Sequence, residues 1–507
     1  MAVMLSASLI TGLCISLPAA ENDLEGAAGS TEVSEKEENG QDSLGEGVPG
    51  DFPGEPPEGG QMGTPPERPD GNGGPGGTPP DGTPPDGNGG PSGPGGAPGG
   101  SSTEIDYAGA VEISSNDTQE GQSYTSNSSD ENALLISTSQ EVTITEPTVT
   151  KTGDSDGGDS CNFYGLNAGI LVKDGSAATI TGGTVTTDAS GANGVFCYGG
   201  NGGQNGADGD GTTVIIRDTA ITTTGDGSGG IMTTGGGTTY AYDLDVNTSG
   251  RSSAAIRTDR GGGTVVVDGG SYTTNGLGSP AIYSTADITV SNATLTSNLS
   301  EGVCIEGLNS ITLNDCDLTA DNTECNGNAT FLDSIMIYQS MSGDADSGTS
   351  HFTMTGGSLT SRMGHVFHVT NTNAVITLEN VEIVNEEEDN VLISVCDDGW
   401  SGGNNTAQLN AAAQNLSGAV LVGSNSSLDL NLTDGSCLEG YVDGKITNAK
   451  GETVSTKAGT VTVSVDESST WILTGDSYVT EFNGNAENVI SNGYTLYVNG
   501  SALTGTN

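Results

Sequence analysis

The sequence predicts an all-β protein, a right-handed parallel β-helix solenoid with three strands per coil, preceded by a disordered linker. A short repeat recurs along much of the chain, and a self-similar unit of this kind is typical of solenoids. Within each repeat, apolar residues alternate with Thr, Ser and charged residues, which is the period of a strand with one buried face. The 507 residues include 82 glycines, and aromatic residues make up only 4%, which suits tight turns around an aliphatic interior.

The repeat between residues 179 and 384 has two apolar positions, one on each side of a bend. The first apolar column is Ile180, Ile216, Ala241, Val267, Val290, Leu313, Met354 and Leu378. Two residues later, the bend positions are Gly182, Asp218, Asp243, Gly269, Asn292, Asp315, Gly356 and Asn380. Three residues after each bend, the second apolar column is Val185, Ile221, Val246, Tyr272, Leu295, Leu318, Leu359 and Ile383. Because a straight strand would place the two columns on opposite faces, the bend residue must turn the chain, and Gly, Asn and Asp enter the left-handed backbone region at least cost.

A third strand precedes these two in each coil. Its inward column is expected at Ile170, Phe196, Ile231, Ile256, Ile282, Cys304, Met336, Phe367 and Ile393, with successive members 22 to 35 residues apart. The excess residues go into loops rich in Gly and Asp. An earlier coil that contains Leu135 and Ile144 has Glu146 at its bend, as expected for an atypical terminal coil.

The N-terminal segments differ from the repeats in composition. Residues 1–20 are apolar and end in small residues, which is typical of a signal peptide, although no Lys or Arg precedes the apolar run. An uncleaved membrane anchor and lipid attachment at Cys14 are the alternatives. Residues 21–104 have no apolar periodicity and are predicted to form a disordered linker rich in Pro, Gly and acidic residues.

The remaining chain is predicted to form the solenoid and its end. Residues 105–440 form the parallel β-helix, and residues 441–507 form C-terminal coils and a cap. We expect the register to loosen after Asp397. The aromatic residues near Trp471 and Tyr494 are expected to close the stack, because an uncovered end exposes a template for aggregation.

The charge of the chain excludes several classes of partner. There are 66 acidic and 12 basic residues, which gives a formal net charge of −54. Nucleic acid is therefore excluded as a partner, because binding it requires a basic surface. An anionic membrane surface would repel the chain, and we expect no membrane insertion of the mature domain. We expect a monomer that is secreted or extracellular, or tethered at the cell surface.

The outward face of the first strand in each coil is predicted to be a sugar platform. Its column is Leu171, Cys197, Met232, Arg257, Tyr283, Ile305, Ile337, His368 and Ser394, which is more apolar than a solvated strand face. Tyr283 would stack on a pyranose ring, and Arg257 would bind a hydroxyl or carboxylate. Asp259 and His368 are the further candidate ligand-binding residues. The alternative is that loops or the linker cover this stripe.

Acidic turns are candidate calcium sites, because flexible carboxylates supply the oxygen ligands that calcium prefers. The candidates are Asp154, Asp156 and Asp159 in one turn, Asp208 and Asp210 in a second, and Asp344 and Asp346 in a third. The alternative is that these turns are simply solvated.

Catalytic residues are not apparent. A glycosidase requires paired carboxylates across a cleft, and Asp397-Asp398 is the one adjacent pair considered. It lies beyond the last regular coil, without a Gly-His-Gly or Arg-x-Lys sequence beside it. We therefore predict no catalytic residue.

The coil at residues 279–296, with the sequence Ser-Pro-Ala-Ile-Tyr-Ser-Thr-Ala-Asp-Ile-Thr-Val-Ser-Asn-Ala-Thr-Leu-Thr, and the Pro-Pro-Asp-Gly repeats of the linker resemble exported β-helix proteins of clostridial gut bacteria. The pattern is also similar to the pectate-lyase-like carbohydrate-binding family, and it covers residues 133–440. The resemblance implies a calcium-supported solenoid that binds plant or host polysaccharide without cleaving it. It assigns no individual binding residue.

Three functional hypotheses follow. The first is a secreted or cell-surface, non-catalytic carbohydrate-binding or adhesive protein whose partner is a polysaccharide or host glycan. The second is a polysaccharide lyase or glycoside hydrolase on the same fold. The third is a structural stalk.

Overall fold

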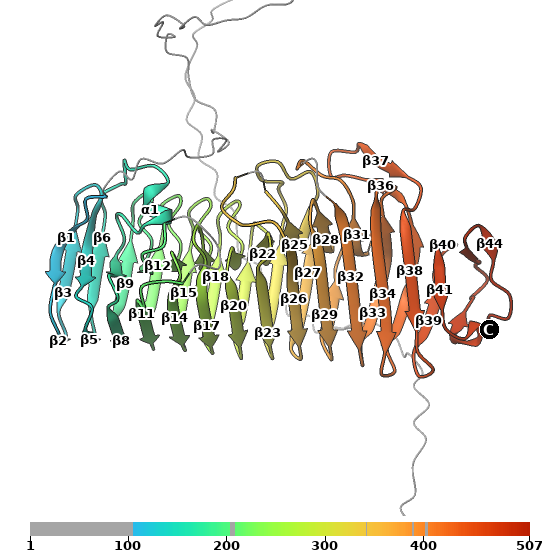
Figure 1. The fold of residues 1–507 in the computed structure, drawn as a ribbon, viewed down its shortest axis with the longest axis horizontal. Helices are drawn as coiled ribbons and strands as arrows, with labels where there is room; N and C mark the ends of the chain where they lie inside the picture. The colour runs from blue at the N-terminus through green and yellow to red at the C-terminus, as the bar shows by residue number, and fades with distance from the viewer. Residues whose placement is uncertain (1–104, 203–207, 341, 388–389, 401–403) are drawn as a thin grey trace, which may run out of the picture. The chain divides into compact units, whose positions relative to one another are not determined.

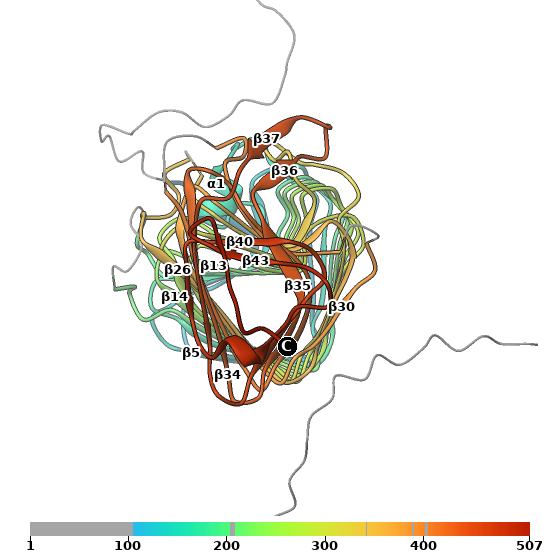
Figure 2. The same cartoon turned by 90° about the vertical axis from the view of Figure 1, so that its right-hand side faces the viewer.

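The coils of the protein stack along one axis (Figure 1). The computed structural model describes residues 105–507, apart from residues 203–207, 341, 388–389 and 401–403. The predicted signal peptide and linker lie outside the described residues. Viewed along the stack, successive coils superimpose around a common interior (Figure 2). The protein is a right-handed parallel β-helix, as the repeat predicts.

The first sheet shows the coil repeat most directly. It has 15 strands, and up to β31 each strand pairs with the third strand further along the chain, so each coil contributes three strands. Its strands, in spatial order, are β1 (Ala108–Ile113), β4 (Glu131–Ser137), β7 (Ile170–Lys173), β10 (Val195–Tyr198), β13 (Ile231–Thr234), β16 (Ile256–Thr258), β19 (Ile282–Ser284), β22 (Val303–Glu306), β25 (Asp333–Tyr338), β28 (His365–Thr370), β31 (Val391–Val395), β33 (Asn415–Val422), β35 (Cys437–Asp443), β39 (Thr470–Leu473) and β42 (Val489–Ile490).

The second and third sheets complete each coil. The second has 14 strands: β2 (Asp117–Glu120), β5 (Glu141–Thr145), β8 (Ala177–Thr181), β11 (Thr213–Arg217), β14 (Gly237–Tyr242), β17 (Gly263–Asp268), β20 (Asp287–Ser291), β23 (Ser310–Asn314), β26 (Thr349–Thr355), β29 (Asn373–Glu379), β32 (Asn405–Ala412), β34 (Ser426–Thr433), β38 (Thr460–Val465) and β41 (Glu481–Asn483). The third has ten: β3 (Ser123–Ser126), β6 (Thr148–Lys151), β9 (Thr184–Thr187), β12 (Ala220–Thr223), β15 (Asp245–Thr248), β18 (Ser271–Thr274), β21 (Thr294–Ser297), β24 (Asp317–Asp321), β27 (Ser358–Met363) and β30 (Glu382–Asn385).

The C-terminal coils are more regular than the sequence predicts. The third sheet ends at β30, and beyond it β32 and β34 pair in parallel over eight residues, as does β34 with β38 over six. The expected loosening of the register after Asp397 is therefore wrong. Parallel pairing also continues past Gly440, because β39 and β42 extend the first sheet.

The last coil ends in a small separate sheet. Its strands are β40 (Ser477–Val479), β43 (Leu496–Val498) and β44 (Ser501–Ala502), and an antiparallel hairpin of β36 (Lys445–Thr447) and β37 (Thr453–Thr456) precedes it. The helical elements are α1 (Ser160–Phe163) and the 3-10 turn η1 (Ala486–Asn488). Trp471 is fully buried within the stack and donates from Nε1 to the Gly440 carbonyl at 3.1 Å, whereas Tyr494 is 42% exposed. Of these two aromatic residues, only Trp471 closes the interior.

The bends have the conformation that their residue types require. All eight predicted bend residues have φ between 49° and 78°, in the left-handed region. Glu146 adopts φ 51° at the earlier coil, and Ala413 adopts φ 50° between β32 and β33. Members of each apolar column pair with one another along the second and third sheets, and all but Ile383 are buried. The two columns are therefore confirmed.

The register of the first sheet differs by one residue at three coils. The inward residues are Val195, Val303 and Ile335, which pair with Ile231, Ile282 and Phe367. Phe196, Cys304 and Met336 were predicted to point inward and instead lie on the outer face, whereas Cys197, Ile305 and Ile337 are part of the core. In the earlier coil, Leu134 faces the interior and Leu135 lies on the outer face. These strands are apolar on both faces, so alternation cannot fix their register.

We predict that Ile282→Asp unfolds the central coils. Ile282 is fully buried between Ile256 and Val303 of the neighbouring strands, and an unpaired carboxylate there costs several kcal/mol. Thermal melting followed by circular dichroism provides the measurement. Thr289→Asp, on the outer face of the second sheet, is the matched control and should melt like the parent. Unchanged melting of both variants would contradict the register.

Candidate functional site

The predicted sugar platform lies on the outer face of the first sheet. The structure assigns its column to Leu171, Phe196, Met232, Arg257, Tyr283, Cys304, Met336, His368 and Ser394. All of these residues are buried except Arg257 and Tyr283, which are partly exposed. The connections that contain α1 and the β36–β37 hairpin lie on one side of the stack in both views (Figures 1 and 2). Most of the apolar stripe is therefore covered.

Two apolar clusters account for the covered parts. Toward the N-terminus, Phe196 and Met232 pack with Leu171 under Tyr107 and Tyr164. Toward the C-terminus, a second cluster contains Cys304, Met336 and Tyr338, packed against Tyr283 and Trp400. Arg257 and Tyr283 lie between these two clusters on the first sheet.

Arg257 is held in place by neighbours from its own coil. Its guanidinium donates to Asp259 Oδ2 at 2.9 Å and to the Ser252 carbonyl at 3.1 Å. Burial raises the pKa of the Asp259 carboxyl to about 6, although the charge of Arg257 opposes this shift. Asp259 is 5% exposed, so it positions Arg257 and offers little surface to a ligand.

Tyr283 is fixed through its hydroxyl group. It donates to Glu306 Oε2 at 2.6 Å, and Tyr338 donates to the same oxygen at 3.3 Å. Ser340 and Ser342 donate to the other oxygen, Glu306 Oε1. Glu306 is 1% exposed and anchors the Tyr283 ring.

A cavity of about 210 Å³ lies beside these two side chains. It is lined by Ser252, Ala254, Arg257, Gly278, Pro280, Tyr283 and Asn326. Asn326 belongs to a loop that extends from the third sheet, and Arg251 holds it by donating to Asn326 Oδ1 at 2.7 Å. The guanidinium of Arg257 lies 6.0 Å from the centre of the Tyr283 ring. The cavity thus combines an aromatic ring, a cation and an amide, which suits a small polar ligand with an apolar face.

His368 is not part of this cavity. It is fully buried, its ring stacks on Phe331 with centroids 4.6 Å apart, and Nδ1 lies 2.8 Å from Ser394 Oγ. Its Nε2 lies 3.3 Å from Asp398 Oδ2. The three polar residues resemble a catalytic triad, but all three side chains are 0% exposed, so a ligand cannot reach them. They join the loops to the first sheet.

The predicted calcium residues do not converge on one point. Asp154 accepts a hydrogen bond from the Ser190 amide at 2.8 Å, and Asp156 shares a hydrogen bond with Asp130 that raises its pKa. Asp159 instead precedes α1.

The other two acidic turns are engaged in different ways. Asp210 accepts from the Thr212 amide at 2.9 Å and from its hydroxyl, whereas Asp208 is exposed. Asp344 pairs with Arg260 at 2.7 Å, and the Asp346 carbonyl accepts from Leu308. Within the described ranges, no group of three or more His, Cys, Asp and Glu could hold a metal ion. Calcium binding at these turns stays a prediction.

Both carboxylates of the adjacent pair Asp397-Asp398 accept hydrogen bonds from other residues of the protein. Asp397 accepts from Asn405 at 2.6 Å, and Asp398 accepts from the Thr330 amide and hydroxyl. Burial raises the pKa of Asp398, but the contact with His368 and the hydrogen bonds from Thr330 and Gly399 together outweigh it, so the net direction is downward. An ionised carboxylate with these partners serves to anchor two loops.

Comparison with known proteins gives no family for this chain. No family, no curated protein and no solved structure matches it. In the part of the chain that the structure describes, no helix is long and apolar enough to cross a membrane.

Sequence reasoning missed Glu306 and Asn326. Asn326 lies in a long loop, and its position depends on contacts with Arg251, 75 residues away. The sequence does contain an indication of Glu306, because a charged residue ends the otherwise apolar strand β22.

Asp333 is a buried carboxyl at the start of β25. Burial raises its pKa well above the ordinary value, and the nearby charges of Glu301 and Asp398 add to this shift. Within the described residues its Oδ1 has no hydrogen-bond partner. The folded protein therefore keeps a proton on Asp333 at a pH where the unfolded chain has lost it.

We predict that Asp333→Asn reduces the loss of stability at high pH. Because the folded pKa is raised, the contribution of Asp333 to stability is full below about pH 4 and is lost as the pH rises toward the folded pKa. Denaturant unfolding at about pH 5 and about pH 8 should show a smaller decline for the variant than for the parent. Asp245→Asn, at an exposed carboxylate, is the control and should leave the decline unchanged. Parallel declines for Asp333→Asn and the parent would contradict this account.

Proposed function

We propose that this chain is an extracellular, non-catalytic protein that binds a polysaccharide or host glycan at the cavity beside Arg257 and Tyr283. The observation that carries the proposal is the composition of the cavity wall. An aromatic ring, a guanidinium and the Asn326 amide line one space of about 210 Å³. Sugars have apolar ring faces and hydroxyl edges, and these three groups complement both.

The size of the cavity indicates the part of a glycan that it accepts. Pockets for drug-sized ligands have volumes of roughly 300–1,000 Å³, so this cavity suits one sugar unit at a chain end or branch. The two side chains are held by Asp259 and Glu306 before any ligand arrives. Preorganisation of this kind lowers the entropy cost of binding.

The state of the carboxylates favours binding over cleavage. A glycosidase requires a carboxylic acid and a second carboxylate that reach the scissile bond. Glu306, Asp259 and Asp344 lie near the cavity, but each is mostly buried and bonded to side chains of the protein. Secretion, surface tethering and an adhesive role are part of the proposal, and they rest on the apolar N-terminal segment, the linker composition and the acidic charge.

The direct experiment is a glycan array probed with the purified full chain. The proposal expects binding to a restricted set of glycans, with no new reducing ends or unsaturated products after incubation with those glycans. Product formation would favour a hydrolase or lyase. An array without any binding would favour a structural stalk.

We predict that Tyr283→Ala weakens binding to an array-selected glycan by about 1–3 kcal/mol. Tyr283→Phe should bind nearly as well as the parent, because it keeps the ring. Both variants lose the hydrogen bond from the Tyr283 hydroxyl to Glu306. The difference in glycan binding between them therefore measures the contribution of the aromatic ring alone. Tyr242→Ala is the matched control, since Tyr242 pairs with Arg217 at 3.7 Å outside the cavity. Calorimetric titration measures the glycan affinity of all three variants. Equal binding by Tyr283→Ala and Tyr242→Ala would contradict the assignment of the site.

Arg257→Lys should also weaken glycan binding, because a point charge cannot replace a planar guanidinium that bonds in two directions. The variant keeps the positive charge beside Asp259, so its melting temperature should stay close to that of the parent. Undiminished binding by this variant would show that Arg257 only supports the fold.

A further inference from the structure

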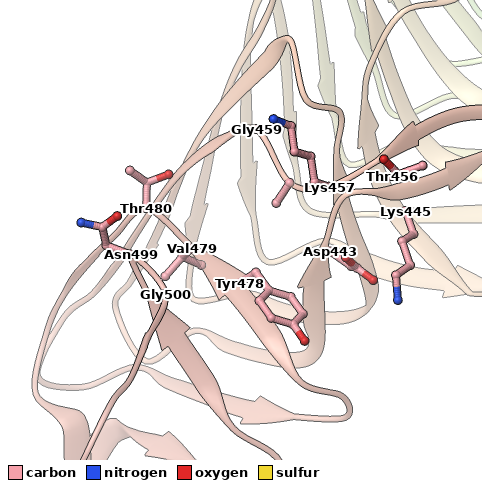
Figure 3. Close-up of a pocket in the computed structure, with 11 residues that line it drawn as sticks. Asp443, Lys445, Thr456, Lys457, Gly459, Tyr478, Val479, Thr480, Asn499 and Gly500 are labelled. Carbon is pink, nitrogen blue, oxygen red and sulfur yellow. The ribbon is translucent and has the colours of Figure 1, made fainter.

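A second cavity lies at the C-terminal end of the stack (Figure 3). It has a volume of about 330 Å³ and lies between the β36–β37 hairpin and the small sheet that contains β40 and β43. The residues that line it are Asp443, Lys445, Thr456, Lys457, Ala458, Gly459, Tyr478, Val479, Thr480, Asn499 and Gly500.

The hairpin wall is fixed to the solenoid. Ile446 is 1% exposed and packs in a cluster with Phe331. Asn448 holds the turn by accepting from the Lys450 and Glu452 amides at 3.0 and 2.9 Å. The Ala449 amide also donates to the Thr330 carbonyl at 2.9 Å. The backbone that carries the cavity lysines is thus held in place before a ligand binds.

The charge of the hairpin is opposite to that of the protein. Residues 444–459 contain three lysines and one glutamate, in a chain with a formal net charge of −54. Lys445 and Lys457 are exposed, and neither ammonium forms an ion pair with any described residue. Asp443 is the one carboxylate among the lining residues, and its Oδ1 accepts from the Gly444 amide at 2.7 Å. The cavity is a local cationic site.

The opposite wall presents an aromatic surface. Tyr478 is 43% exposed, and its ring stacks on Tyr497 with centroids 5.2 Å apart and an interplanar angle of 6°. The two tyrosines pair directly on adjacent parallel strands, which keeps the rings aligned. Figure 3 shows the Tyr478 ring on the same side of the hairpin as the Lys445 ammonium, whereas the Lys457 ammonium points away from the ring and Thr480 and Asn499 lie on the far side of Val479.

We propose that this cavity binds a carboxylated sugar unit. Tyr478 supplies a stacking surface for a pyranose ring, and the Lys445 ammonium, on the same side of the hairpin as Tyr478 in Figure 3, supplies the cation for a carboxylate on that ring, while Lys457 adds positive charge at longer range. A polyanion would be repelled by the rest of the chain, whereas a single acidic sugar contacts mainly the local positive charge. This inference rests on the proposed function only in taking the ligand to be a glycan. The second cavity and the cavity beside Arg257 share no lining residue.

The test is calorimetric titration of the full chain with sialyllactose, and with lactose as the neutral probe. Sialyllactose should bind at least about ten-fold more tightly than lactose, the loss expected when a hydrogen bond to a charged group is missing. Lys445→Gln and Tyr478→Ala should each weaken sialyllactose binding by about ten-fold, whereas Lys457→Gln should weaken it less. Lys450→Gln is the matched control, because Lys450 lies on the same hairpin outside the cavity, and it should bind like the parent. A melting curve for each variant checks that the fold is intact.

Three outcomes would overturn the inference. The first is equal binding of sialyllactose and lactose. The second is an equal loss of binding in Lys450→Gln, which would indicate a general charge effect. The third is loss of sialyllactose binding in Tyr283→Ala, which would assign the acidic sugar to the other cavity and leave the proposed function standing. Methyl glucuronide serves as a second probe; if it binds through the same lysines, the ligand class is carboxylated sugars in general.

Discussion

Each coil up to β30 depends on one residue in the left-handed backbone region. That residue turns the chain between the second and third sheets, so two apolar positions five residues apart both face the interior. Polar contacts between successive bends reinforce the stack; Asn292, for example, donates to Asp268 Oδ1 of the preceding coil at 2.7 Å. Because the bends and the inward columns carry the fold, the connections between the third and first sheets are free to vary in length.

The variable connections decide where a ligand can reach the protein. Long connections cover the outer face of the first sheet at both ends, where they bury Phe196 and His368. In the central coils the turns before Arg257 and Tyr283, together with the loop that contains Asn326, leave a cavity. The connections that project from the coils therefore shape both cavities: the loop that contains Asn326 lines the candidate site, and the β36–β37 hairpin lines the second cavity.

Local chemistry made part of this structure predictable. The residue types at the bends fixed the second and third sheets, because Gly, Asn and Asp mark a left-handed turn at a constant spacing. In the first sheet, Val195, Phe196 and Cys197 are all apolar and all buried, so the sequence offered no alternation to set the register. Arg257 and Tyr283 were assigned correctly to the outer face, but the burial of their neighbours depends on loops that contact them from distant coils. The roles of Glu306 and Asn326 depend on the same long-range contacts, which no local pattern encodes.

Hydrogen–deuterium exchange of the full chain, with and without a glycan selected on the array, tests the central claim most directly. Bound glycan should slow amide exchange in the turns before Arg257 and Tyr283 and in the loop that contains Asn326, which together form the cavity wall. Exchange in the second sheet, on another side of the stack, should not change. Protection confined to other segments, or no protection at saturating glycan, would contradict the assignment of the binding site.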